Sequence, residues 1–104
     1  MAQFDVWQNP NKATQKHIPY LLEVQSNLLE PIATRVVIPL ARATERRKPA
    51  KYLNPLFVVE KTKVVMLTEQ IAGIPLKAVG KHVTTLGAQR GEIMAAVDFL
   101  FAGI

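Results

Sequence analysis

The chain has 104 residues, of which 49% are apolar, and a net charge of +5. This length and apolar content predict one folded domain with one modest core and exclude an intrinsically disordered chain. No apolar run approaches the roughly 20 residues that a membrane span needs. The absence of cysteine excludes disulfides and thiolate chemistry, and it is compatible with the cytoplasm, where we expect the protein to act. The first twelve residues, MAQFDVWQNPNK, lack the pattern of a signal peptide.

The first half of the chain predicts three strands. Residues 3–8, QFDVWQ, alternate in polarity and place Trp7 on the face opposite Phe4 and Val6. Residues 9–12, NPNK, favour a turn. Residues 17–26 predict a second strand, in which Pro19 indicates an edge position or the first residues. Residues 34–40, TRVVIPL, predict a third strand that Pro39 closes.

Two apolar segments in the second half predict a β-hairpin. Residues 55–60, PLFVVE, and residues 63–68, KVVMLT, flank Lys61 and Thr62, although neither residue is the glycine that a tight turn prefers. Residues 73–83 predict a loop and a short strand. The short connections favour antiparallel pairing of about six strands.

The last segment has helical periodicity, from about residue 87 to residue 102. Ile93, Val97, Leu100 and Ile104 form one stripe, so we expect them to face the sheet. Thr84 or Thr85 is the expected cap. Asp98 and Ala102 lie on the opposite side, with Phe99 on the flank. Two interpretations of Phe99 stay open: it packs under a loop, which we favour, or it contacts a partner. The fold class predicted is mainly β with a C-terminal helix.

Most of the positive charge lies in one segment, residues 41–52. The segment contains five basic residues and a single acid, Glu45, which gives it a charge of +4. The basic residues are Arg42, Arg46, Arg47, Lys48 and Lys51. Such a segment attracts an acidic peptide or a phosphate backbone. It is equally compatible with a solvated loop that has no partner.

Few catalytic or metal-binding constellations are present. His17 and His82 are isolated and lack metal-ligand spacing, the carboxylates do not pair at the spacing of a metal loop, and Ser26 is the only serine. We therefore predict no metal or cofactor. One enzyme class stays open, because a metal-independent ribonuclease positions Arg and Thr around a phosphate without a local motif. A nucleic-acid-binding module is less expected, since aromatic residues do not interleave with the basic ones.

Several segments, in chain order, resemble the CcdB family, the toxins of a bacterial toxin–antitoxin pair. They are MAQFDVW, EVQSNLLE, TRVVIPL, GIPLKAVG and FLFAGI, which together span the whole chain. The resemblance implies an SH3-like barrel of antiparallel strands with a C-terminal α-helix, assembled as a homodimer and without enzymatic activity. It implies a toxin that binds the A subunit of DNA gyrase and traps the complex in which DNA is cleaved. It also implies an antitoxin whose acidic C-terminal segment neutralises the toxin. The toxin would contact operator DNA only through this antitoxin, which supplies the DNA-binding domain of the complex.

The resemblance also implies site residues. The gyrase-binding set is Ser26, Leu28, Leu29, Asp98, Phe101, Ala102, Gly103 and Ile104. The five basic residues of segment 41–52 become candidates for the antitoxin. The chain departs from the family pattern at Ala102, where the pattern has tryptophan, at Asp98, where it has asparagine, and at the leucine pair, where it has isoleucines. Because tryptophan often dominates binding energy, a degenerate toxin that binds antitoxin without poisoning gyrase is an alternative.

Overall fold

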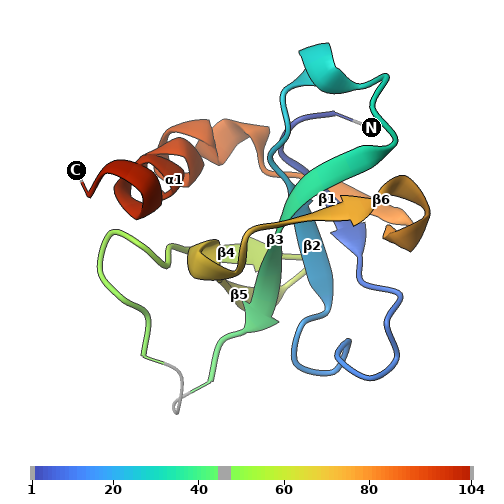
Figure 1. The fold of residues 1–104 in the computed structure, drawn as a ribbon. Coiled ribbons are helices and arrows are strands. Elements are labelled where there is room, and N and C mark those ends of the chain that lie inside the picture. The colour runs from blue at the N-terminus through green and yellow to red at the C-terminus, as the bar shows by residue number, and fades with distance from the viewer. Residues whose placement is uncertain (1, 45–47, 104) are drawn as a thin grey trace.

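The computed structural model describes residues 2–44 and 48–103, which form a curled β-sheet with one α-helix against it (Figure 1). The seven strands and the helix are β1 (Asp5–Gln8), β2 (Tyr20–Glu23), β3 (Thr34–Arg42), β4 (Leu56–Val59), β5 (Thr62–Met66), β6 (Ala72–Pro75), β7 (His82–Thr85) and α1 (Arg90–Ala102). Short 3-10 turns connect them, among them η1 (Asn27–Leu29), η2 (Thr68–Gln70), η3 (Leu76–Ala78) and η4 (Gly87–Gln89). The predicted antiparallel, barrel-like β fold with a C-terminal helix is confirmed.

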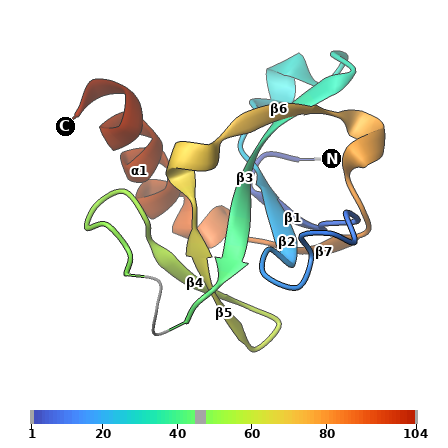
Figure 2. The same ribbon diagram turned by 60° about the horizontal axis from the view of Figure 1, so that its bottom comes forward.

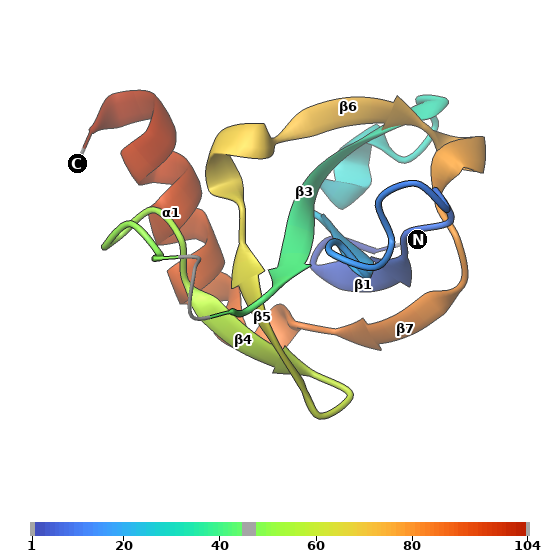
Figure 3. The same ribbon diagram turned by 90° about the horizontal axis from the view of Figure 1, so that it is seen from below.

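The sheet curls because β3 pairs with two different strands along one of its edges. The strand order is β4-β5-β3-β2-β1-β7, and every pairing is antiparallel. β6 pairs with the first half of β3, Thr34–Val37, whereas β5 pairs with its end, Leu40–Arg42. The strands therefore bend into a half-barrel, which Figures 2 and 3 show from two further sides.

Helix α1 closes this half-barrel with one apolar stripe. Ile93 and Ala96 are fully buried against Phe57, Val59 and other core residues of the sheet. Val97 packs at the margin of the same core, and Leu100 is half-buried, as the periodicity predicts. Ile104, the last residue of the predicted stripe, lies outside the described residues.

Pro39 does not close the third strand, so that prediction is wrong: β3 continues to Arg42. The carbonyl of Pro39 accepts a hydrogen bond from the N–H of Leu67, on the edge that faces β5 and β6. Pro39 lies opposite the gap between these two strands, since β6 ends its pairing at Val37 and β5 begins at Leu40. A proline there removes no ladder hydrogen bond, which is why the strand tolerates it.

Other boundaries differ by a few residues. The hairpin is confirmed, but Glu60 and Lys61 form its turn, with φ angles of 46° and 65°. The second strand starts only after Pro19 and spans four residues. The helix starts at Arg90 after the turn η4, whose first N–H, that of Gly87, is bonded to the Thr85 hydroxyl. Strand β6 falls partly in a segment predicted as a loop.

Candidate functional site

The turn between β2 and β3 presents an exposed apolar tip. The Ser26 hydroxyl accepts a hydrogen bond from the N–H of Leu28, at 3.2 Å, and so caps the turn η1. Leu28 projects from this turn with 90% of its surface exposed, and Leu29 and Ile32 are also exposed. Three neighbouring aliphatic side chains in water are unusual for a short loop and indicate a contact surface. Sequence reasoning named Ser26, Leu28 and Leu29 but missed Ile32.

Two buried side chains hold this tip in place. Arg35, only 3% exposed, donates to the carbonyl oxygens of Glu30 (2.8 Å), Thr34 (2.9 Å) and Ile32. Gln25 donates to the carbonyl oxygen of Leu29, at 3.1 Å, and accepts from the N–H of Val36, at 3.0 Å. Loop carbonyls that would otherwise need water are thus bonded to the sheet, so the tip has a fixed shape.

The charge of Arg35 is balanced by a second buried group. Its Nε lies 3.7 Å from a carboxylate oxygen of Glu23, which is also buried. The other oxygen of Glu23 accepts a hydrogen bond from the Trp7 indole, at 3.2 Å. Burial raises the pKa of Glu23, while the Trp7 hydrogen bond and the Arg35 charge act against that rise. The result is a Trp7–Glu23–Arg35 network directly behind the apolar tip.

A second exposed apolar group lies at the end of α1. Phe101 is 73% exposed, and Asp98, Ala102 and Gly103 are exposed beside it. Gly103 ends the helix in the left-handed conformation, with φ 70°, and its N–H bonds to the Phe99 carbonyl at 2.9 Å. Ile104 lies outside the described residues.

The two apolar groups are not adjacent within one chain. The turn η1, which precedes β3, and the C-terminal end of α1 lie well apart in all three views (Figures 1–3). The sequence-predicted set is therefore split into two separate patches, which we name the tip patch (Ser26, Leu28, Leu29, Ile32) and the terminal patch (Asp98, Phe101, Ala102, Gly103).

The basic residues of segment 41–52 are also distributed. Arg42 ends β3, and its Nε donates to the Lys16 carbonyl at 2.9 Å, beside the loop that follows β1. Lys51 lies instead beside α1, with its ammonium 5.1 Å from the centre of the Tyr52 ring, and Lys48 is exposed. Arg46 and Arg47 lie outside the described residues.

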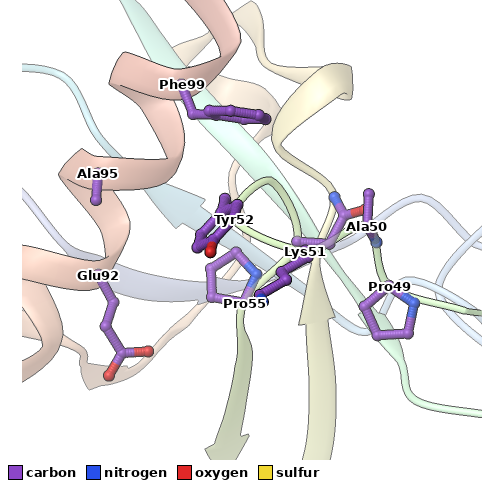
Figure 4. A pocket seen from close by; sticks show the side chains of 9 residues that line it. Pro49, Ala50, Lys51, Tyr52, Pro55, Glu92, Ala95 and Phe99 are labelled. Atoms are coloured by element: carbon purple, nitrogen blue, oxygen red, sulfur yellow. The ribbon is translucent and has the colours of Figure 1, made fainter. Parts of the chain in front are cut away.

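A hollow of about 500 Å³ separates the segment around Tyr52 from α1 (Figure 4). Pro49, Ala50, Lys51, Tyr52, Asn54 and Pro55 line one side, and Glu92, Ala95 and Phe99 line the other. The rings of Tyr52 and Phe99 meet at 5.9 Å between centroids. Phe99 is half-buried and packs against this segment, as the favoured interpretation predicts. Sequence reasoning missed the hollow, because only the fold brings Tyr52 to the helix.

Within residues 2–44 and 48–103, no three His, Cys, Asp or Glu side chains gather as metal ligands would. His82 is an exposed strand residue 3.5 Å from a carboxylate oxygen of Asp5 and packs edge-on against Trp7. None of the helices described is long and apolar enough to cross a membrane.

The family model described as CcdB protein matches residues 3–103, almost the whole chain. The chain belongs to the CcdB family. The predicted family resemblance is therefore confirmed, and membership supports a toxin of a toxin–antitoxin system. The exposed residues Leu28, Leu29 and Phe101 of these two patches lie in segments that the resemblance names.

Proposed function

We propose that this protein is a toxin that binds the A subunit of DNA gyrase and traps the complex in which DNA is cleaved. The observation that carries the proposal is the exposure of two apolar patches in a chain of the CcdB family. Leu28 and Phe101 are the most exposed large apolar side chains of the residues described. The protein would act by contact, without catalysis of its own, in the bacterial cytoplasm, where gyrase works.

The separation of the two patches supports a homodimer. One partner element that contacts both patches must otherwise span the molecule. A two-fold axis can bring the terminal patch of one copy to the tip patch of the other, and it doubles a short apolar surface. Sedimentation should show a dimer, and Leu28→Glu together with Phe101→Glu should weaken either the dimer or gyrase binding.

The basic segment supports an acidic antitoxin. Arg42, Lys48 and Lys51 are exposed, and the segment carries most of the net charge. Association with an acidic antitoxin should slow with added salt. Neutralising Arg46, Arg47 and Lys48 together should weaken it, and unchanged binding would contradict this role. Operator DNA would be contacted only through the antitoxin.

The testing experiment is DNA cleavage by purified protein, gyrase, ATP and supercoiled plasmid, followed by denaturation and electrophoresis. Linear DNA that accumulates with dose would support the proposal. Leu28→Glu should abolish the accumulation of linear DNA. Leu76→Glu, the same substitution at an exposed leucine of η3, should not. Normal supercoiling without linear DNA would refute gyrase poisoning.

One observation favours a second candidate. Ala102, where the family pattern has tryptophan, is exposed and offers little contact area. A degenerate toxin would bind antitoxin without trapping gyrase. Ala102→Trp would then create cleavage activity that the natural chain lacks. A ribonuclease remains the enzyme alternative, and RNA cleavage by purified protein that an Arg substitution abolishes would support it.

A further inference from the structure

A groove runs between α1 and the segment from Pro49 to Val58. Its upper part is the hollow beside Tyr52, and its lower part is an adjoining hollow of about 460 Å³ lined by Leu56, Phe57, Val58, Lys63, Leu86, Gln89 and Glu92. Glu92 lines both parts, and Pro55 and Leu56 are consecutive, so the two hollows form one groove. We name it the β4–α1 groove.

The wall formed by β4 is an unpaired strand edge. Within the described residues, β4 is the last strand of the sheet and pairs only with β5. The Pro55 carbonyl accepts from the N–H of Met66, at 2.9 Å, which fixes the phase of the ladder. Alternate residues of an antiparallel strand face the same neighbour, so Phe57 and Val59 face β5. The N–H and C=O groups of Leu56 and Val58 therefore point outward.

The same edge is apolar. Val58 is 63% exposed and Leu56 is also exposed, whereas Phe57 and Leu86 form a buried floor. Native edge strands usually carry charge, a proline or a covering element, because an exposed apolar edge pairs with other chains. β4 has a proline only before its first residue, at Pro55. An edge of this kind fits an extended segment that adds as a further strand.

The charges along the groove favour an acidic occupant. Lys51 lines its upper part and Lys63 its lower part, against the single acid Glu92. Neither lysine makes an ion pair with any residue that the structure describes. In an added strand, alternate side chains would enter the groove against Phe57, Ala95 and Phe99, and the others would face water and the lysines.

We propose that the β4–α1 groove binds an extended segment of alternating apolar and acidic residues, added as a strand to the free edge of β4. This rests on the antitoxin pairing proposed above and assigns a binding mode to its acidic segment. The helical wall from Gln89, the last residue of η4, to Phe99 on α1 is about 15 Å long, which matches about five residues of strand.

The probe is a fluorescein-labelled peptide of alternating valine and glutamate, about eight residues long. Its binding to the full chain is followed by fluorescence anisotropy at low and high salt. Ala95→Glu should weaken binding at least about 10-fold by blocking and repelling the segment. Ala88→Glu is the matched control, because Ala88 is exposed on η4 and lines neither hollow. Lys63→Glu should also weaken binding, and Lys77→Glu on η3 should not.

Two N-methylated peptides test strand addition itself. In an extended chain the N–H groups of all valines point to one edge and those of all glutamates to the other. Methylation of one set should abolish binding, and methylation of the other set should leave it unchanged. A peptide that binds the groove without joining β4 would respond equally to the two methylations, whether or not it loses affinity, and an equal response would overturn the proposal.

Other outcomes also decide the matter. Equal binding to the natural chain, Ala95→Glu and Lys63→Glu would overturn the groove as the site. A dimer that Ala95→Glu dissociates, with no peptide binding, would assign the groove to a second copy of this chain and overturn the proposal. The plasmid cleavage assay separates the two proposals: cleavage without peptide binding refutes the groove alone, and peptide binding without cleavage refutes gyrase poisoning alone.

Discussion

Arg35→Met removes the cation that holds the apolar tip and balances Glu23. Methionine retains an apolar stem of similar length, so the main loss is the charge and its hydrogen bonds. Glu30, Ile32 and Thr34, whose carbonyls Arg35 binds, are exposed residues, and water can replace the lost donors. The carboxylate of Glu23 is buried and has no such replacement.

The expected loss of unfolding free energy follows from this difference between the exposed carbonyls and the buried carboxylate of Glu23. Removal of one partner from a buried ion pair costs about 3–5 kcal/mol, a large share of the roughly 5–15 kcal/mol that stabilises a domain. Glu23→Gln in the Arg35→Met background removes the stranded charge and should recover about 1–3 kcal/mol. The cost of Arg35→Met should also shrink at low pH, because Glu23 escapes its unpaired state by binding a proton.

Urea unfolding measures all four proteins of this double-mutant cycle. Trp7 is the only tryptophan and donates to Glu23, so its fluorescence reports unfolding from within the network. A loss below about 1 kcal/mol for Arg35→Met, or losses that simply add in the double variant, would refute the claim that the two buried charges depend on each other.

Three further predictions concern the stability of the fold. Burial raises the pKa of Glu23 above 4.5, so the folded state holds this proton more tightly than the unfolded chain does. The unfolding free energy of the natural protein, relative to that of Glu23→Gln, should therefore fall as pH rises from 4.5 through the folded pKa. Urea titrations of both proteins at several pH values measure this difference. Gly80→Ala places a methyl group 2.6 Å from the Gln8 carbonyl oxygen and should cost about 1–3 kcal/mol in thermal unfolding, whereas Gly73→Ala, with open space around it, should cost less. Thr68→Val leaves the Leu53 carbonyl without the hydrogen bond that the buried Thr68 hydroxyl donates to it. This change should lower the urea midpoint by an amount equivalent to about 1–3 kcal/mol. An unchanged midpoint would contradict that role of Thr68.

Local patterns predicted the strands and the helix but not how distant strands combine. The alternation around Trp7 and the periodicity from Ile93 to Leu100 are local signals, and both elements were found. Strand β6 owes its pairing to Thr34–Val37, some forty residues earlier in the chain, and no local pattern reveals such a partner. The hairpin turn was placed one residue late because Glu60 and Lys61 take left-handed conformations that usually favour glycine.

The candidate site was predictable only where family motifs name it. Leu28, Leu29 and Phe101 are exposed, as a contact role requires. Arg35 and Gln25 resemble ordinary polar residues in the sequence, because their role depends on loop carbonyls that only the folded turn brings to them. The same holds for Tyr52, whose left-handed backbone, with φ 70°, accompanies its contact with Phe99.

Strand β3 links two surfaces that can evolve separately. The tip patch precedes it, the basic segment follows it, and its nine residues are held on both edges by β2, β5 and β6. Insertions or exchanges at either end leave those ladders intact. On the roles proposed for these two surfaces, a lineage could acquire a new antitoxin by changing the segment after Arg42 without altering the apolar tip, and the reverse is equally open. Divergence of toxin–antitoxin pairs then needs no repacking of the core.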